Sequence, residues 1–99
     1  MVLKVPVSFH PEATAELEVS ADWYAQQNPH AARDFCVAAD IAMENIAADP
    51  ERFVKIDARH HACSALGVPF QIVFRHDAQH VYVVAVAHSK RRPGYWRGR

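Results

Sequence analysis

Residues 81–87 form an unbroken apolar run, VYVVAVA, and a group of basic and aromatic residues follows it directly. Side chains of a strand alternate between the two faces of a sheet, and both alternating sets of this run are largely apolar. A strand of this kind is stable only when both of its faces are covered. A chain of 99 residues therefore has to fold as one small domain with this segment inside it.

Two segments before this run have helical periodicity. The first is predicted from about His10 to Gln27, with a proline in its first turn and acidic residues at the positive end of its dipole. The second follows the Asn28-Pro29 pair, which suits an N-cap and a first turn, and ends at Asp49-Pro50. The apolar residues on one face of each segment are Ala13, Leu17, Ala21 and Tyr24 in the first and Phe35, Ala39, Ala42 and Ile46 in the second. We expect an antiparallel helical hairpin.

The remaining apolar segments predict strands. Residues 2–9 alternate around Pro6, which favours a strand at a sheet edge. Residues 70–75 alternate as a half-buried strand does, and Asp77-Ala78-Gln79 supplies a turn into the apolar run. A further strand begins near Phe53, Val54 and Ile56, whereas residues 57–67 have no assignable pattern.

The predicted fold class is α+β. An N-terminal strand, an antiparallel helical hairpin and a three-stranded antiparallel meander form one small sheet in the order β-α-α-β-β-β. The chain contains no internal repeat or Gly/Ser-rich linker, so residues 1–99 are interpreted as a single domain.

Charge is divided between the two halves of the chain. Residues 1–51 contain two basic and nine acidic side chains, and residues 52–99 contain nine basic and two acidic ones. The formal net charge of zero therefore conceals a dipolar molecule. A surface of one sign attracts partners of the other sign, so we expect the basic half to meet an anionic partner.

Composition makes several classes of protein unlikely candidates. No window approaches the roughly 20 apolar residues that a membrane span requires, and the N-terminus lacks the pattern of a secretory signal. We expect a cytoplasmic protein without a membrane partner or a cofactor. Cys36 and Cys63 have no second cysteine nearby and are expected to be small buried hydrophobes, and adjacent His60 and His61 point to opposite faces of a strand, so no metal site is expected.

The C-terminal group is the candidate for target binding. Its members are His88, Lys90, Arg91, Arg92, Tyr95 and Trp96. Aromatic residues this close to a terminus reduce solubility unless they pack on the domain or meet a partner, and both possibilities stay open. For His88 there are also two interpretations, a proton acceptor beside Lys90 and Arg91, or a residue that caps the strand end through a backbone hydrogen bond.

Motifs spread over nearly the whole chain also resemble those of a known family. They are Phe9-His10-Pro11-Glu12-Ala13, Glu16-Leu17, Trp23-Tyr24, Phe35, Ile46, Asp49-Pro50, Val68-Pro69-Phe70, Ile72-Val73-Phe74, residues 83–88 and residues 90–96. In this order and spacing they resemble the RelE/ParE superfamily of type II toxin–antitoxin toxins, also described as plasmid stabilisation proteins, and most closely its ParE-like branch. The resemblance implies a sheet packed on a helical hairpin, and an antitoxin partner.

The two branches of that superfamily imply different chemistry. RelE-like members cut messenger RNA on the ribosome, which requires proton transfer and cations around the reacting phosphate. If this chain were such a nuclease, the candidate residues would be Arg91, Arg92, Tyr95, His88, Arg59 and Lys55, a set poorer in lysine and arginine than is usual. ParE-like members inhibit DNA gyrase by binding and need no catalytic group. We expect the gyrase inhibitor, with the endonuclease and an inactive protein-binding module as alternatives.

The antitoxin is expected to use apolar surface that the helices leave uncovered. Trp23 and Tyr24 are adjacent on a helix and so about 100° apart around its axis, which prevents both from pointing into one core. The expected antitoxin contacts are Trp23, Tyr24, Phe74 and Tyr82. A disordered partner segment could add a strand to the sheet or lay a helix across it.

Overall fold

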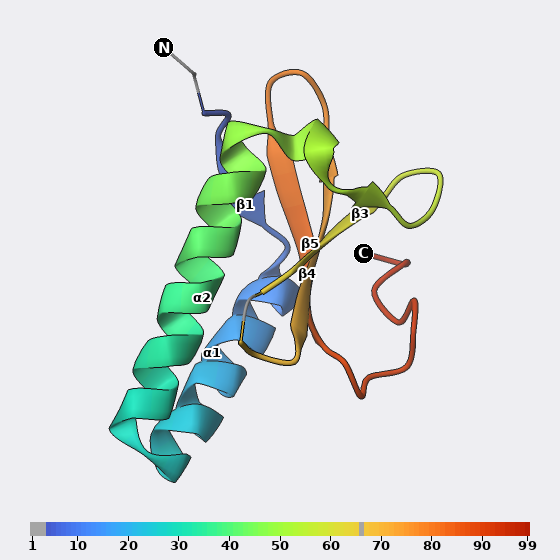
Figure 1. Cartoon of the computed structure of the whole chain (residues 1–99). Helices are drawn as coiled ribbons and strands as arrows, with labels where there is room; N and C mark the ends of the chain where they lie inside the picture. Colours follow the sequence, from blue (N-terminus) through green and yellow to red (C-terminus); the bar gives the residue numbers. More distant parts are fainter. Residues whose placement is uncertain (1–3, 66) are drawn as a thin grey trace.

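The computed structural model describes residues 4–65 and 67–99, which form a sheet with two helices on one of its faces (Figure 1). Its elements are β1 (Val7–Phe9), α1 (Pro11–Gln27), α2 (Pro29–Ala48), a short 3-10 helix η1 (Pro50–Arg52), β2 (Val54–Lys55), β3 (His61–Ser64), β4 (Phe70–His76) and β5 (Val81–His88). The α+β class and the helical hairpin are confirmed. The sheet has five strands in the order β1-β5-β4-β3-β2, which is one more than predicted.

The sheet is mixed, because β1 runs parallel to β5 while the other neighbours are antiparallel. The antiparallel meander is therefore present but has four strands, β2 to β5, rather than the predicted three. The N-terminal strand does lie at an edge, as Pro6 predicted: Pro6 has no N–H to donate, and its carbonyl accepts a hydrogen bond of 2.9 Å from the Val81 N–H. β1 begins at Val7, and residues 2 and 3 of the predicted strand lie outside the described residues.

The helix boundaries follow local capping chemistry. His10 Nδ1 accepts a hydrogen bond of 3.0 Å from the Glu12 N–H at the start of α1. Asn28 Oδ1 accepts one of 2.7 Å from the Ala31 N–H at the start of α2. In both helices a proline follows the cap, where its missing N–H costs nothing. The predicted helices of residues 10–27 and 28–49 are confirmed.

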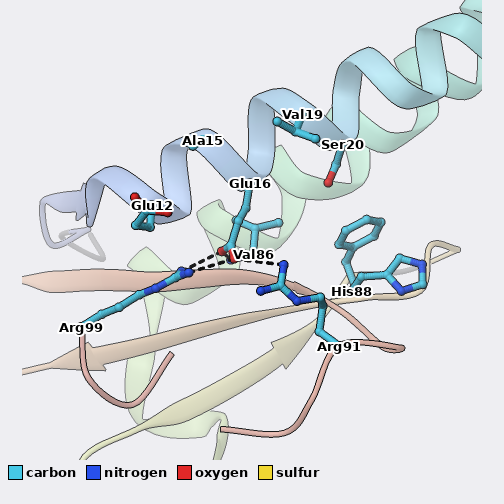
Figure 2. Close-up of a pocket in the computed structure, with 10 residues that line it drawn as sticks. Glu12, Ala15, Glu16, Val19, Ser20, Val86, His88, Arg91 and Arg99 are labelled. Carbon is cyan, nitrogen blue, oxygen red and sulfur yellow. Dashed lines mark hydrogen bonds and ion pairs between the residues drawn. The ribbon is translucent and has the colours of Figure 1, made fainter. Parts of the chain in front are cut away.

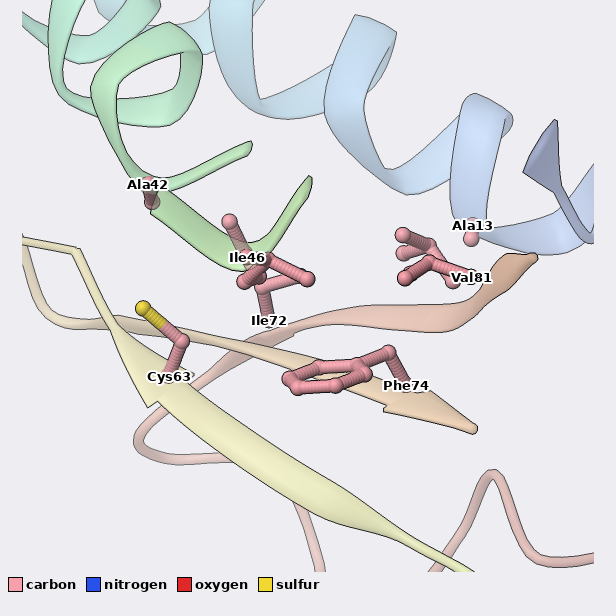
Figure 3. Packing of buried hydrophobic residues seen from close by; sticks show 8 residues of the cluster. Ala13, Ala42, Ile46, Cys63, Ile72, Phe74 and Val81 are labelled. Carbon is pink, nitrogen blue, oxygen red and sulfur yellow. The ribbon is translucent and has the colours of Figure 1, made fainter. Parts of the chain in front are cut away.

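The main core lies between the helices and the sheet (Figure 3). Ile46 from α2, Phe74 from β4 and Val81 from β5 are fully buried there. At the other end of the helices, Tyr24 stacks on Phe35 with ring centroids 5.2 Å apart, and Phe35 packs edge-on against Phe70. The apolar stripes predicted for the two helices are thus the surfaces that meet the sheet.

Two expectations from the middle of the chain are corrected. The strand predicted near residues 53–56 is limited to Val54–Lys55, and the segment without a pattern contains β3, which pairs with both β2 and β4. Cys63 is buried in β3, but Cys36 is exposed, because its neighbour Phe35 takes the inward position and the next residue of a helix lies about 100° away.

The face of the sheet opposite the helices, called the outer face below, is covered by the C-terminal tail, residues 89–99 (Figure 1). Trp96 packs there against Ala85 and Ala87 of β5 and is 5% exposed. β5 bulges at Val84, because Val73 is paired with Ala85 and Phe74 with Val83, leaving Val84 without a partner in β4. The prediction that the apolar run is covered on both faces is confirmed.

Candidate functional site

Glu16 of α1 is the residue at which the helix, β5 and the tail meet (Figure 2). Its carboxylate accepts hydrogen bonds from the Val86 N–H at 3.1 Å and from the Tyr95 hydroxyl at 2.7 Å. The Arg99 guanidinium donates to both carboxylate oxygens, at 2.9 and 3.1 Å. Arg91 lies at the outer limit of an ion pair, 4.0 Å away. One carboxylate therefore anchors the tail at its beginning and at its end.

This network closes an open edge of the sheet. β1 is paired with β5 only along residues 81–83, so beyond Val83 the β5 edge has no neighbouring strand. Glu16 accepts from the Val86 N–H there, and Arg99 Nη1 donates to the Val84 carbonyl at 3.0 Å. Unpaired backbone groups at a buried edge are costly, and these two side chains satisfy them as a strand would.

The protonation states of the network are fixed at neutral pH. Burial alone would raise the pKa of Glu16, but the hydrogen bonds from Arg99, Tyr95 and the Val86 N–H outweigh it and lower that pKa below its ordinary value. Burial and the bond to Glu16 raise the pKa of Tyr95 to about 12. The same carboxylate raises the pKa of Arg99. The carboxylate is thus ionised and the phenol stays protonated.

A second carboxylate holds the middle of the tail. Asp57 accepts hydrogen bonds from Arg97 Nε at 3.3 Å and from His60 Nδ1 at 2.9 Å. His60 is buried, and its ring meets Trp96 at a centroid distance of 4.6 Å. Hydrogen bonds from the Arg59 and His60 N–H groups and from the His60 and Arg97 side chains keep the pKa of Asp57 well below its usual range. The tail is therefore fixed to the domain on both sides of Trp96.

The expected target-binding residues separate into two groups. Lys90, Arg91 and Arg92 are exposed in the turn that follows β5, and we call these three residues the basic turn. Tyr95 is half-buried against Glu16, and Trp96 is packed on the outer face. Of the two possibilities that the sequence left open for the aromatic pair, the structure shows packing on the domain, with Trp96 buried and Tyr95 half-buried.

His88 has the geometry of the capping interpretation. Its Nδ1 accepts a hydrogen bond of 3.0 Å from the Lys90 N–H, and its ring meets the Phe70 ring edge-on at 5.0 Å. Two of the expected nuclease residues, Lys55 and Arg59, lie apart from it. Lys55 is in β2 and Arg59 in the loop after it, so β3 and β4 separate them from β5 in the sheet. Among the described residues no hydrogen bond or ion pair links this region to Arg91 or Tyr95.

The expected antitoxin residues do not share one surface. Trp23 is 56% exposed and, with Tyr24, lines a groove between α1 and the sheet. Phe74 is fully buried beneath the helices, and Tyr82 lies on the outer face. The full set of residues lining the groove, called the α1 groove below, is Val19, Ser20, Trp23, Tyr24, Phe70 and His88. Phe74 and Tyr82 are therefore left out of any surface centred on Trp23.

The anchors of the tail were not predicted as functional residues. Glu16 was placed only as a helix residue and part of a motif, and Asp57, Arg97 and Arg99 had no assigned role. The available signal was the isolated acidic Asp57 in the basic half of the chain, together with arginines that continue beyond the aromatic pair.

Within residues 4–65 and 67–99, no group of three or more His, Cys, Asp or Glu side chains is arranged to hold a metal ion. Among the described helices, none is long and apolar enough to cross a bilayer.

Comparison with known proteins agrees with this architecture. A search of curated proteins found no match. A chain in the solved structure of the chromosomal ParDE TA system from P. aeruginosa has the same fold, with a TM-score of 0.74 at 12% sequence identity over 88% of this chain and 98% of that chain. Residues 7–93 match the family model for the ParE toxin of the type II toxin–antitoxin system, parDE. Because that match spans most of the sequence, the chain belongs to the ParE toxin family of type II toxin–antitoxin systems.

Proposed function

We propose that the chain inhibits DNA gyrase by binding it, and that a cognate antitoxin neutralises this activity. The proposal depends on one observation, the basic turn of Lys90, Arg91 and Arg92, which is exposed while the chain on either side of it is fixed. At its start, the turn is tied to the end of β5, because the Arg91 N–H donates to the His88 carbonyl at 3.0 Å. After the turn, Tyr95 is bound to Glu16. A rigid, charged segment of this kind loses little entropy on binding a macromolecule.

The charges of the basic turn are largely available to a partner. Arg97 and Arg99 are paired with Asp57 and Glu16, whereas in the described residues no ion pair involves Lys90 or Arg92. The Arg91 side chain is 54% exposed, and its guanidinium lies 4.0 Å from the centroid of the Tyr95 ring, which restricts its position. Such a group of cations favours an acidic surface or DNA bound to the target enzyme.

The endonuclease alternative is less well supported by the geometry. A nuclease needs groups that exchange a proton near neutral pH, but the Tyr95 hydroxyl donates to Glu16 and its pKa is raised to about 12. Lys55 lies in β2 and Arg59 in the loop after it, and β3 and β4 separate β2 from β5, the strand that the basic turn follows. A binding surface therefore accounts for these residues better than a catalytic one.

The α1 groove is the surface that we assign to the antitoxin. It combines the exposed Trp23 ring with Tyr24 and Phe70. Val19, which also lines the groove, is 68% exposed. Exposed apolar residues that form one patch are typical of interaction sites. The helix that borders the groove, α1, belongs to the acidic half of the chain, so the proposed occupant is an amphipathic antitoxin segment with basic residues flanking its apolar face.

Induction of the chain in bacteria tests the proposed target. We expect filamentation and a DNA-damage response without early cleavage of messenger RNA. Rapid loss of translation with cut messages would instead support the endonuclease. A chain without any growth effect would be an inactive binding module, and the proposal would be wrong.

Co-purification with the product of the neighbouring gene tests the antitoxin surface. Trp23→Ser should weaken capture at least about tenfold, because exposed Trp residues are frequent hot spots of interfaces. Val54→Ser is the matched control, since Val54 is 65% exposed but lies in β2, away from the groove. Equal capture by the two variants would contradict the assignment.

A further inference from the structure

A second group of polar and aromatic residues lies on the outer face, at the end of the sheet that is remote from the basic turn. Tyr82 of β5 is paired with Ser8 of β1 on one side and with Arg75 of β4 on the other. Paired residues of neighbouring strands point to the same face. Tyr82 packs at the margin of the outer cluster around Trp96, so this row of three side chains lies on the outer face, beside the part that the tail covers.

Arg75 is a cation without an acidic partner. Its guanidinium carbon lies 5.2 Å from the centroid of the Tyr82 ring, and no ion pair of Arg75 occurs among the residues that the structure describes. Asp77, which borders the same hollow, uses Oδ1 to accept a hydrogen bond from the Gln79 N–H. A guanidinium that is stacked on an aromatic ring keeps its outer N–H groups available for an anion.

Imidazole rings surround this pair. The rings of His10 and His80 lie 6.3 and 6.4 Å from the Tyr82 ring, and His80 Nε2 is 2.7 Å from the Ser8 hydroxyl. His10 Nδ1 accepts the N-cap hydrogen bond of α1, which leaves its Nε2–H as a donor. His76 also borders the hollow, but it is paired with the buried Val81 and its ring lies 4.8 Å from that of His61, on the face that the helices cover. The site therefore combines flat rings, one unpaired guanidinium and several N–H or O–H donors.

We propose that this surface, formed by Ser8, His10, Arg75, His80 and Tyr82, binds single-stranded nucleic acid. Arg75 and the imidazoles of His10 and His80 would contact phosphate oxygens, while a base stacks on the Arg75 guanidinium or on the Tyr82 ring. Aromatic residues on the open face of a sheet are a general way to bind unpaired bases. An acidic peptide would satisfy the cation but has no planar group for the rings, so the composition favours nucleic acid.

This site is distinct from the basic turn, and the proposal does not depend on gyrase inhibition. The basic turn lies beyond the C-terminal end of β5, at His88, whereas Tyr82 and Arg75 lie at the opposite end of the β4–β5 hairpin, next to the turn of residues 77–80. Variants at one site can therefore be tested without altering the other.

Fluorescence anisotropy with labelled 12-nucleotide single strands of RNA and DNA tests the proposal on the full chain. Arg75→Gln should weaken binding about tenfold and lower the slope of log affinity against log salt by about 1. Tyr82→Leu should also weaken binding about tenfold, through lost stacking. Arg75→Lys retains the charge without the planar group and should give an intermediate loss.

Arg33→Gln is the matched control for charge, because Arg33 is an exposed residue of α2 on the other side of the molecule. It should bind as the unaltered chain does. Arg75→Gln does not remove a core contact, so the thermal unfolding transition of this variant should be unchanged. A loss of nucleic-acid binding can then be attributed to the missing guanidinium rather than to unfolding. The proposal is wrong if no strand binds, if Arg33→Gln and Arg75→Gln weaken binding equally, or if an oligoglutamate peptide competes as well as the oligonucleotide does.

Discussion

Glu16 determines where the C-terminal tail lies. It is an acidic residue on a helix, and helix charges are ordinarily exposed, yet its side chain is only 13% exposed and accepts hydrogen bonds from the strand backbone, a phenol and a guanidinium. Removing one partner of such a network leaves the others buried without compensation. The strength of the network therefore depends on the negative charge of this one residue.

Glu16→Gln tests the contribution of that charge. Glutamine has nearly the same shape but cannot bind Arg99 as a carboxylate does, and we expect the free energy of unfolding to fall by about 2 kcal/mol. Urea denaturation followed by circular dichroism measures the change. Glu18→Gln, an exposed neighbour on the same helix, should change it by less than about 0.5 kcal/mol. Equal effects of the two substitutions would show that Glu16 behaves as a surface residue.

The same residue predicts acid sensitivity. The pKa of Glu16 is lower in the folded chain than its ordinary value of 4.5, so the folded state takes up the proton at a lower pH than the unfolded state does. Its contribution to stability is complete above about pH 5 and is lost as the pH falls through the lowered pKa. Unfolding free energies between pH 3 and 6 should therefore fall less steeply in Glu16→Gln than in the unaltered chain. An equal decrease of the unfolding free energy with falling pH in the two proteins would contradict this prediction.

Tyr95 should make the stability of the folded chain fall at alkaline pH. Its pKa is raised from 10.0 to about 12 in the folded chain, so between these values the unfolded state loses the phenolic proton first. The stability that the phenol contributes is present below pH 10 and lost towards pH 12. Tyr95→Phe should be less stable by about 1.5 to 3 kcal/mol at pH 7, through the lost bond to Glu16. It should also lose less stability over the alkaline range, which denaturation at pH 9 and 11 would measure.

At the scale of elements, the sequence was informative where local chemistry decides the structure. Each helix begins with a capping side chain followed by a proline, His10-Pro11 in α1 and Asn28-Pro29 in α2. These local signals can be recognised without knowledge of the rest of the chain. β4 and β5 were likewise recognisable from alternation and from a continuous apolar run.

Other elements depend on distant contacts and could not be predicted. β3 has four residues, HACS, with no alternation of its own, and it is a strand because β2 and β4 pair with it. The tail depends on Glu16, which lies 79 residues before Tyr95 in the chain. The sequence therefore predicted the basic residues of the candidate site, because charged side chains are usually exposed. It did not predict the residues that anchor the tail.

Removal of the tail tests its role as a cover. A chain that ends at Gly94 lacks Tyr95, Trp96 and Arg99, so it exposes the outer apolar face and leaves the β5 edge without Arg99. We expect binding of the dye ANS and concentration-dependent association, because open edges and apolar faces promote aggregation. Light scattering over a tenfold range of concentration measures the association. A truncated chain that stays monomeric and does not bind the dye would show that the tail is not needed as a cover.

At the scale of the whole molecule, the two oppositely charged halves of the sequence are partly joined. Arg99 of the basic half is neutralised by Glu16 of the acidic half, whereas Arg97 is paired with Asp57 of the basic half itself. The basic turn stays exposed and borders α1, because Arg91 lies 4.0 Å from Glu16. The acidic residues are concentrated in α1 and α2. A cationic surface that suits an anionic target therefore lies next to a helix that suits a partner with basic residues.

Inhibition of supercoiling by purified DNA gyrase tests the central proposal most directly. The unaltered chain should inhibit the enzyme, and replacing Lys90, Arg91 and Arg92 with Gln should reduce its potency at least about tenfold. Replacing Arg52, Lys55 and Arg59 with Gln removes the same charge from another exposed region and should leave the potency unchanged. An unaltered chain that never inhibits gyrase, or a basic-turn variant that inhibits it equally well, would contradict the account.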